Sequence, residues 1–155
     1  MDLRDVLTMN FRNNHWVLMK HAEGWSHEES LMRAGAGGNT FNWVLGHVVA
    51  SRNDIFALLG EPPVWSEADA APYVRGSHEL APAMARQLSA ILADLDRSQE
   101  RLTARLERLT AAELAAAHGD SALGKQLTFL QFHETYHVGQ TGLLRRLAGK
   151  EGVIR

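Results

Sequence analysis

Leucines at helical repeats constrain the fold of this chain more than any other feature. Leu88, Leu95, Leu102 and Leu109 recur every seven residues, and two further leucines occupy intervening positions of the same face. A seven-residue apolar repeat is the pattern of a helix that packs along a bundle seam. We therefore predict a long helix over about 79–109 and a fold in which helices pack against helices.

Three further segments have apolar residues at helical spacing. They predict long helices over about 3–22, 41–59 and 125–148. Ser26 and Thr110 each stand three residues before a glutamate, which is the pattern of a capping box and predicts a short helix after each. Because no stretch alternates apolar and polar residues between hairpin signals, we expect an all-α fold.

The chain has 155 residues, which is most simply one helical domain over residues 1–155 with a continuous core. Its longest connection, 60–78, contains three of the four prolines. Fully extended it could reach about 60 Å, roughly twice the ~29 Å length of the helix predicted over 41–59. It could return the chain along the whole bundle, and its Trp65, Tyr73 and Arg75 could form a lid or an inert crossover.

Composition excludes several classes of function. The chain has no cysteine, so a cysteine-based zinc site, a protein thiol nucleophile and a disulfide framework are ruled out. Any thiol chemistry would use a thiol from the substrate. The net charge of −2 and the pI near 6.4 give no electrostatic basis for binding nucleic acid.

The N-terminal residues contain no apolar signal core. No apolar run approaches the ~18 residues of a membrane-spanning helix. We therefore expect a cytoplasmic protein that does not bind membranes.

Three histidines indicate a metal site. His133 and His137 are four residues apart in a segment predicted to be helical, so their side chains share one face about 6 Å apart along the axis. His47 lies in the helix predicted over 41–59. Together the three imidazoles could hold one cation with an open coordination position, which is typical of catalytic sites. The alternative is that each ring is buried and satisfied by hydrogen bonds.

The residues from His133 to His137 also match the HExxH pattern of zinc metalloproteases, in which Glu134 would be the general base. The extended form of that pattern needs glycine and histidine where this chain has Gln140 and Leu143. A peptidase is therefore the weaker interpretation.

Two residues near the histidines are candidates for orienting them. Glu134 is either an acceptor for an imidazole or a solvated helix residue, and Gln140 either reaches the site or packs in the bundle. The remaining histidines have no partner at ligand spacing and are interpreted as surface or connector residues: His15, His21, His27, His78 and His118.

Several segments resemble the DinB/YfiT-like superfamily over nearly the whole chain. They are Gly-His-Val-Val-Ala-Ser-Arg at 46–52, Leu-Gly-Glu-Pro at 59–62, His-Glu-Thr-Tyr-His-Val-Gly-Gln at 133–140 and Leu-Arg-Arg-Leu-Ala-Gly at 144–149. The resemblance implies a four-helix bundle of up-down-down-up topology, with a long crossover between its second and third helices, and a homodimer. It also implies one divalent ion held by His47, His133 and His137.

The resemblance further implies a class of reaction, because characterised members join small thiols such as bacillithiol or mycothiol to electrophiles. The leading hypothesis is therefore a metal-dependent thiol transferase whose partners are a small-molecule thiol and an electrophile. A hydrolase that uses a metal-bound hydroxide and a noncatalytic metal-binding or dimerisation bundle are the alternatives. Imidazole ligands suit both Zn and Ni.

Overall fold

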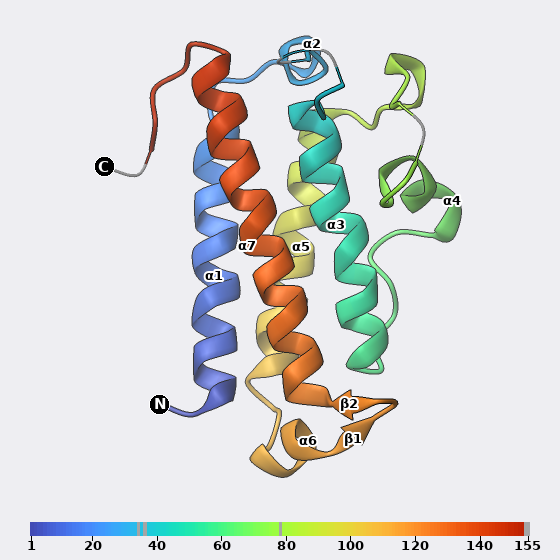
Figure 1. Cartoon of the computed structure of the whole chain (residues 1–155), viewed down its shortest axis with the longest axis vertical. Coiled ribbons are helices and arrows are strands. Elements are labelled where there is room, and N and C mark those ends of the chain that lie inside the picture. The colour runs from blue at the N-terminus through green and yellow to red at the C-terminus, as the bar shows by residue number, and fades with distance from the viewer. Residues whose placement is uncertain (34, 36, 78, 154–155) are drawn as a thin grey trace.

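Four long helices form the body of the molecule in the computed structural model, which describes residues 1–33, 35, 37–77 and 79–153. They are α1 (Leu3–Ala22), α3 (Phe41–Leu58), α5 (Leu88–Leu106) and α7 (Leu123–Leu147). Helices α1 and α7 run in one direction and α3 and α5 in the other, so the order along the chain is up-down-down-up (Figure 1). The predicted four-helix bundle is confirmed.

Side-chain caps define where the helices begin. Asp2 caps α1 and Thr40 caps α3, where the Thr40 hydroxyl accepts a hydrogen bond from the Trp43 N–H. Both capping boxes predicted from sequence are present. Ser26 opens α2 (His27–Ser30) and Thr110 opens α6 (Ala111–Ala115).

The third long helix is shorter than predicted. The sequence pattern favoured 79–109, but α5 begins at Leu88 and ends at Leu106. Before it, Pro82 opens the short 3-10 helix η2 (Pro82–Met84), and the chain is then extended at Ala85. Proline lacks the N–H that an α-helix interior needs. At the other end Leu109 stays buried although it lies outside the helix, so the leucine repeat reports packing beyond the helix end.

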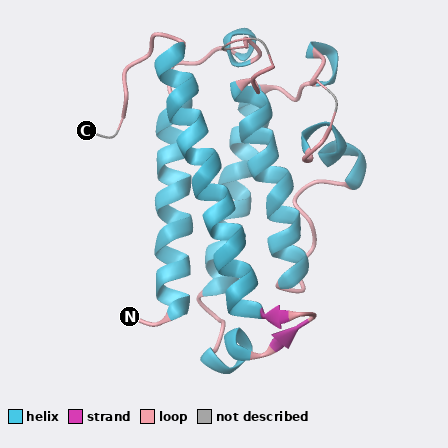
Figure 2. Ribbon diagram, in the orientation of Figure 1, coloured by secondary structure: helices cyan, strands magenta, loops and turns pink. Residues whose placement is uncertain are grey.

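A small β-hairpin departs from the predicted all-α fold (Figure 2), and an isolated antiparallel bridge joins Arg33 to Thr40. The hairpin pairs β1 (Ala117–His118) with β2 (Ser121–Ala122) in antiparallel register. Gly119 adopts a positive φ of 61° in the turn. The hairpin leads directly into α7, which therefore begins at Leu123 instead of near 125.

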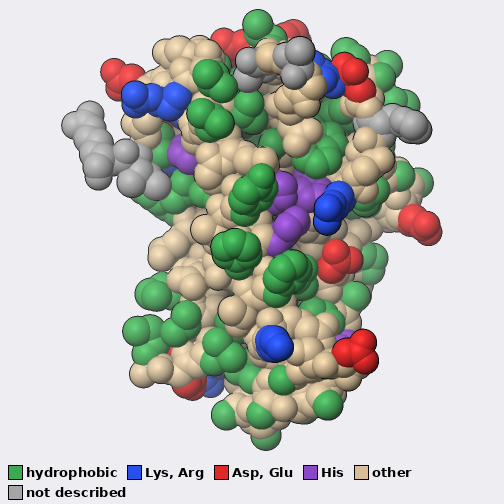
Figure 3. Space-filling model, in the orientation of Figure 1, with side chains coloured by type: hydrophobic (Ala, Val, Ile, Leu, Met, Phe, Trp, Pro, Cys, Tyr) green, Lys and Arg blue, Asp and Glu red, His purple; other side chains and the backbone are tan. Residues whose placement is uncertain are grey.

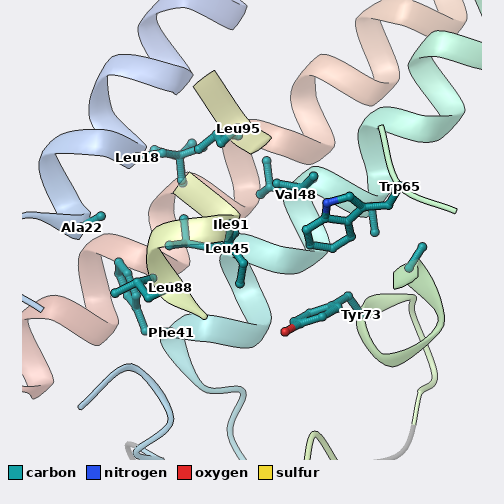
Figure 4. Packing of buried hydrophobic residues seen from close by; sticks show 14 residues of the cluster. Leu18, Ala22, Phe41, Leu45, Val48, Trp65, Tyr73, Leu88, Ile91 and Leu95 are labelled. Atoms are coloured by element: carbon teal, nitrogen blue, oxygen red, sulfur yellow. The ribbon is translucent and has the colours of Figure 1, made fainter. Parts of the chain in front are cut away.

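The connection between α3 and α5 returns the chain along α3 and is partly helical (Figure 1). It contains α4 (Glu67–Ala70) and the 3-10 helix η1 (Ala71–Tyr73). Trp65 and Tyr73 point into the core and are 3% and 0% exposed (Figure 4). The lid hypothesis is therefore wrong for these two residues, whereas Arg75 is exposed.

The core residues around Trp65 and Tyr73 come from all four long helices. Leu18, Leu45 and Ile91 represent α1, α3 and α5 in Figure 4, and Val138 is the contribution of α7. A second buried cluster fills the other half of the bundle and includes Phe11, Phe56 and several leucines, among them Leu102. The crossover is thus fixed to the upper half of the core.

None of the helices in the described ranges combines the length and the apolar character that crossing a bilayer requires.

Candidate metal centre

His47 is held in place by the crossover. Its Nδ1 donates a hydrogen bond to the backbone carbonyl of Tyr73, 2.6 Å away. Because a carbonyl can only accept, Nδ1 carries the proton of the neutral ring and Nε2 presents a lone pair. Gly46 makes this approach possible, since a Cβ at that position would lie 2.2 Å from Tyr73 Cδ1.

Trp43 supports the same arrangement from one turn earlier in α3. Its indole stacks on the His47 ring with a centroid distance of 4.7 Å and an interplanar angle of 7°. The indole N–H donates to the Pro72 carbonyl at 3.2 Å. The orientation of His47 is therefore determined jointly by α3 and the crossover.

The structure brings His47 together with His133, which is 86 residues away in sequence, and with His137. Nε2 of His133 lies 3.4 Å from Nε2 of His47 and 3.1 Å from Nε2 of His137. One nitrogen from each of the three rings lies within 4.8 Å of the others. His47 and His137 are buried and His133 is partly exposed.

The donor set fits a divalent ion. Gln140 Oε1 lies 2.7 Å from Nδ1 of His137, which assigns the proton to that nitrogen and leaves Nε2 with a lone pair, as in His47. Two lone pairs thus face His133, and one proton on His133 can satisfy only one of them. Metal–nitrogen bonds of about 2.0–2.1 Å place tetrahedral ligands roughly 3.3 Å apart, close to the spacing observed here.

All three rings are biased towards the neutral form that binds metal. Burial lowers the pKa of His137 to about 4, although its hydrogen bond with Gln140 opposes the shift. Burial also lowers the pKa of His47 and of His133. Neutral imidazoles are the ligating species, so the site is ready to bind a cation at neutral pH.

Glu134 is directed into the bundle, away from the imidazoles. Its carboxylate accepts hydrogen bonds from Arg52 Nε at 3.0 Å and Arg52 Nη2 at 3.2 Å, and it is 3% exposed. Neither sequence interpretation of Glu134, as an acceptor for an imidazole or as a solvated residue, matches this position. The peptidase interpretation requires Glu134 as a free general base, but its carboxylate is paired with Arg52.

Arg52 ties three helices together. Besides Glu134 on α7, its guanidinium donates to Ser98 Oγ at 2.7 Å and Gln99 Oε1 at 2.9 Å on α5. Sequence reasoning missed this network, although Arg52 stands on the apolar face of its helix between Val48 and Ile55, which is a signal that it is buried and paired.

A cleft of about 680 Å³ lies beside the histidines and is lined by His47 and His133 together with α3, α7 and the crossover. Figure 3 shows histidine side chains reaching the surface midway along the bundle, with a basic and an acidic side chain beside them and hydrophobic side chains around. The charged residues of the lining are Asp54, Glu67 and Arg75. A small molecule in this cleft could therefore reach the histidine cluster.

The other histidines are less uniform than predicted. His21 was expected at the surface but is 6% exposed, and its Nδ1 lies 2.9 Å from Thr141 Oγ1 on α7. His15 is partly buried and lies 2.9 Å from the Asp96 carboxylate. His118 is exposed in the hairpin, and His78 lies outside the described residues. Because Thr141 is remote from His21 in sequence, no local sequence pattern indicates this contact.

Comparison with known proteins is consistent with this architecture. The sequence matches the DinB superfamily over residues 11–141. No curated protein matches the chain. A conserved protein from Enterococcus faecalis has a similar structure, with a TM-score of 0.78, 16% identity and coverage of 97% of this chain and 99% of that one.

YfiT from Bacillus subtilis is also similar, with a TM-score of 0.68, 21% identity and coverage of 96% of this chain and 89% of that one. It is described as a probable metal-dependent hydrolase with an unusual four-helix bundle topology. At these identities the two structures establish the shared fold, and the sequence match spans most of the chain. The protein therefore belongs to the DinB superfamily.

Proposed function

We propose that this protein is a metal-dependent transferase that joins a low-molecular-weight thiol to an electrophile, with His47, His133 and His137 as ligands of one Zn or Ni ion. The observation that carries the proposal is the convergence of three neutral imidazoles beside a cleft large enough for a small molecule. Three histidine ligands leave a coordination position open. The absence of cysteine means that the thiol is a substrate.

Each residue of the site has a distinct task. The Tyr73 carbonyl and Gln140 orient His47 and His137, so that the lone pairs of both rings are preorganised. A divalent ion at this position would supply positive charge that lowers the pKa of a thiol and keeps it as the nucleophilic thiolate. On binding, the thiol would lose its proton to solvent, and the cleft would hold the electrophile beside the sulfur. The thiolate would then form the carbon–sulfur bond as the bond to the leaving group breaks, and the leaving group would depart with that electron pair.

A hydrolase is the second candidate, and two observations favour it. YfiT, which shares this fold, is described as a probable metal-dependent hydrolase. Asp54 lines the same cleft and could accept a proton from water. Against it, Glu134, which would be the base in an HExxH site, is paired with Arg52. A thiolate needs no base during its attack, so thiol transfer is the better supported function.

Thiol-dependent conjugation tests the proposal. Zinc-loaded protein is incubated with an aryl chloride electrophile and, in turn, bacillithiol, mycothiol, glutathione and coenzyme A. We expect the protein to accelerate conjugation of at least one thiol, His137→Ala to abolish the gain, and the exposed-site control His118→Ala to retain it. Ester or amide cleavage without any thiol would instead support the hydrolase, and neither reaction would leave a noncatalytic metal-binding bundle.

The exposed face of α7 supports a homodimer as part of this proposal. Large apolar side chains recur along it at helical spacing and are 59–65% exposed: Phe129, Phe132, Tyr136, Leu143 and Leu147. Such a stripe on one helix is typical of a surface that packs against another helix. We expect a dimer in light scattering that becomes monomeric in Phe132→Glu. Met84→Glu, at an equally exposed apolar residue elsewhere, should remain dimeric, and a monomeric wild type would refute the dimer.

A further inference from the structure

The cleft beside the histidines carries charges of both signs on two of the elements that line it. Asp54 comes from α3, and Arg75 follows η1 in the crossover. Both side chains are exposed, and neither takes part in a salt bridge with another residue of the described ranges. Arg86 and Asp69, by contrast, form a salt bridge with each other. Glu67, the third charged residue of the lining, is also in no salt bridge within the described ranges. These three charges therefore remain available to a ligand.

Both charges lie close to the candidate metal centre. Asp54 is seven residues after His47, which is two turns along the same face of α3, or about 10 Å. Arg75 is two residues after Tyr73, whose carbonyl holds His47. Asp54 and Arg75 line the same cleft as His47 and His133. A ligand in that cleft could therefore contact both charges and the histidine cluster.

The rest of the lining is largely apolar and would exclude water from part of a bound molecule. Trp65, Val74 and Leu130 contribute to it, and Glu67 adds a second acidic group. A purely anionic ligand would be repelled by Asp54 and Glu67. A purely cationic ligand would be repelled by Arg75 and by a bound metal ion. A ligand with separated positive and negative groups can pair with the acidic residues and with Arg75 at the same time.

We propose that the cleft selects a dipolar thiol, in which Arg75 binds a carboxylate, Asp54 binds an ammonium group, and the sulfur faces His47, His133 and His137. This inference rests on the proposed thiol-transfer function and adds the two residues that would determine its thiol specificity. A guanidinium is suited to the carboxylate, because its planar fork matches the two oxygens. The carboxylate of Asp54 is the complementary partner for a cation.

Cobalt-substituted protein allows thiol binding to be measured separately from turnover. A thiolate that binds Co²⁺ produces a sulfur-to-metal absorption band, which can be titrated to give a dissociation constant. Three probes of similar size separate the two charged contacts: 3-mercaptopropionate is anionic, thiocholine carries a permanent cation that cannot chelate, and 2-mercaptoethanol is neutral. Arg75→Gln and Asp54→Asn each remove one of the two charges. Asp120→Asn, in the hairpin, is the control at a remote position.

We expect Arg75→Gln to weaken 3-mercaptopropionate roughly two- to fivefold, as for exposed ion pairs, with little effect on 2-mercaptoethanol. Asp54→Asn should weaken thiocholine by a similar factor and should not weaken 3-mercaptopropionate. If the two variants affected all three probes equally, or affected none, the dipolar specificity would be overturned. The thiolate band would in that case still support thiol binding and the proposed function. Absence of the band with every thiol would refute thiol binding itself and this inference with it.

Discussion

Arg52 and Glu134 form a two-point ion pair inside the bundle, with Nε–Oε2 and Nη2–Oε1 distances of 3.0 and 3.2 Å. Their side chains are 0% and 4% exposed. Glu134 directly follows His133, and Arg52 is on the same helix as His47, so the pair couples α3 to α7 next to the candidate metal centre. The pair thus helps to align helices that carry different ligands.

Removing one partner should be costly. Glu134→Ala leaves an uncompensated guanidinium in the core, and we expect the free energy of unfolding to fall by about 3–5 kcal/mol. The double variant Arg52→Met/Glu134→Leu should recover most of that loss, since it buries no charge. Urea unfolding measures both. A single variant as stable as wild type would show that the pair is not buried in solution.

Metal content should follow the three histidines. We expect about one divalent ion per chain in purified protein and a large loss in His47→Ala, His133→Ala and His137→Ala, because each removes one ligand from a three-ligand set. His118→Ala is the matched control. Elemental analysis is the measurement, with circular dichroism to verify folding. Equal metal content in all variants would disprove the site.

Removing the metal should lower stability without unfolding the helices. The leucine-rich core can form without a metal ion, whereas a ligand that binds only the folded state adds stability. After chelation we expect an unchanged helical circular dichroism spectrum and a lower Tm. If the helical signal disappeared, the metal would instead be structural.

Acid should destabilise the metal-free protein over a defined range. The pKa of His137 is about 4 in the folded protein and about 6.5 in an unfolded chain. Between these values the unfolded chain binds more protons, so stability falls as pH decreases from about 6.5 to about 4. His137→Asn should show a shallower dependence in urea unfolding at a series of pH values. An identical slope in the variant would contradict the depressed pKa.

Gly46 should be intolerant of a side chain. In Gly46→Ala the new Cβ would lie 2.2 Å from Tyr73 Cδ1 and 2.3 Å from Cε1, so the crossover must move and the His47 hydrogen bond is disturbed. We expect a loss of about 1–3 kcal/mol and weaker metal binding. Gly139→Ala, also within a long helix but with nothing within 4 Å of the added Cβ, should be neutral or slightly stabilising. Similar stabilities of the two variants would argue against the close contact.

Local sequence signals were sufficient for the presence of the four long helices and for the two capping boxes, although they placed the start of α5 too early. Ser26 and Thr110 begin helices as predicted, because a capping box involves residues only three apart. The same reasoning places His133 and His137 on one face of α7, since four residues make about one helical turn. These features depend on neighbours within a turn of the chain, and the sequence contains all of that information.

Contacts between remote segments were decided only by the tertiary structure. His47 meets His133 because α3 and α7 pack together, and the 86-residue separation leaves no periodic signal. Glu134 was ambiguous in sequence because its partner Arg52 is on another helix, and the buried bond between His21 and Thr141 was missed for the same reason. Such pairings arise from the summed burial of whole helix faces, which no short window of sequence contains.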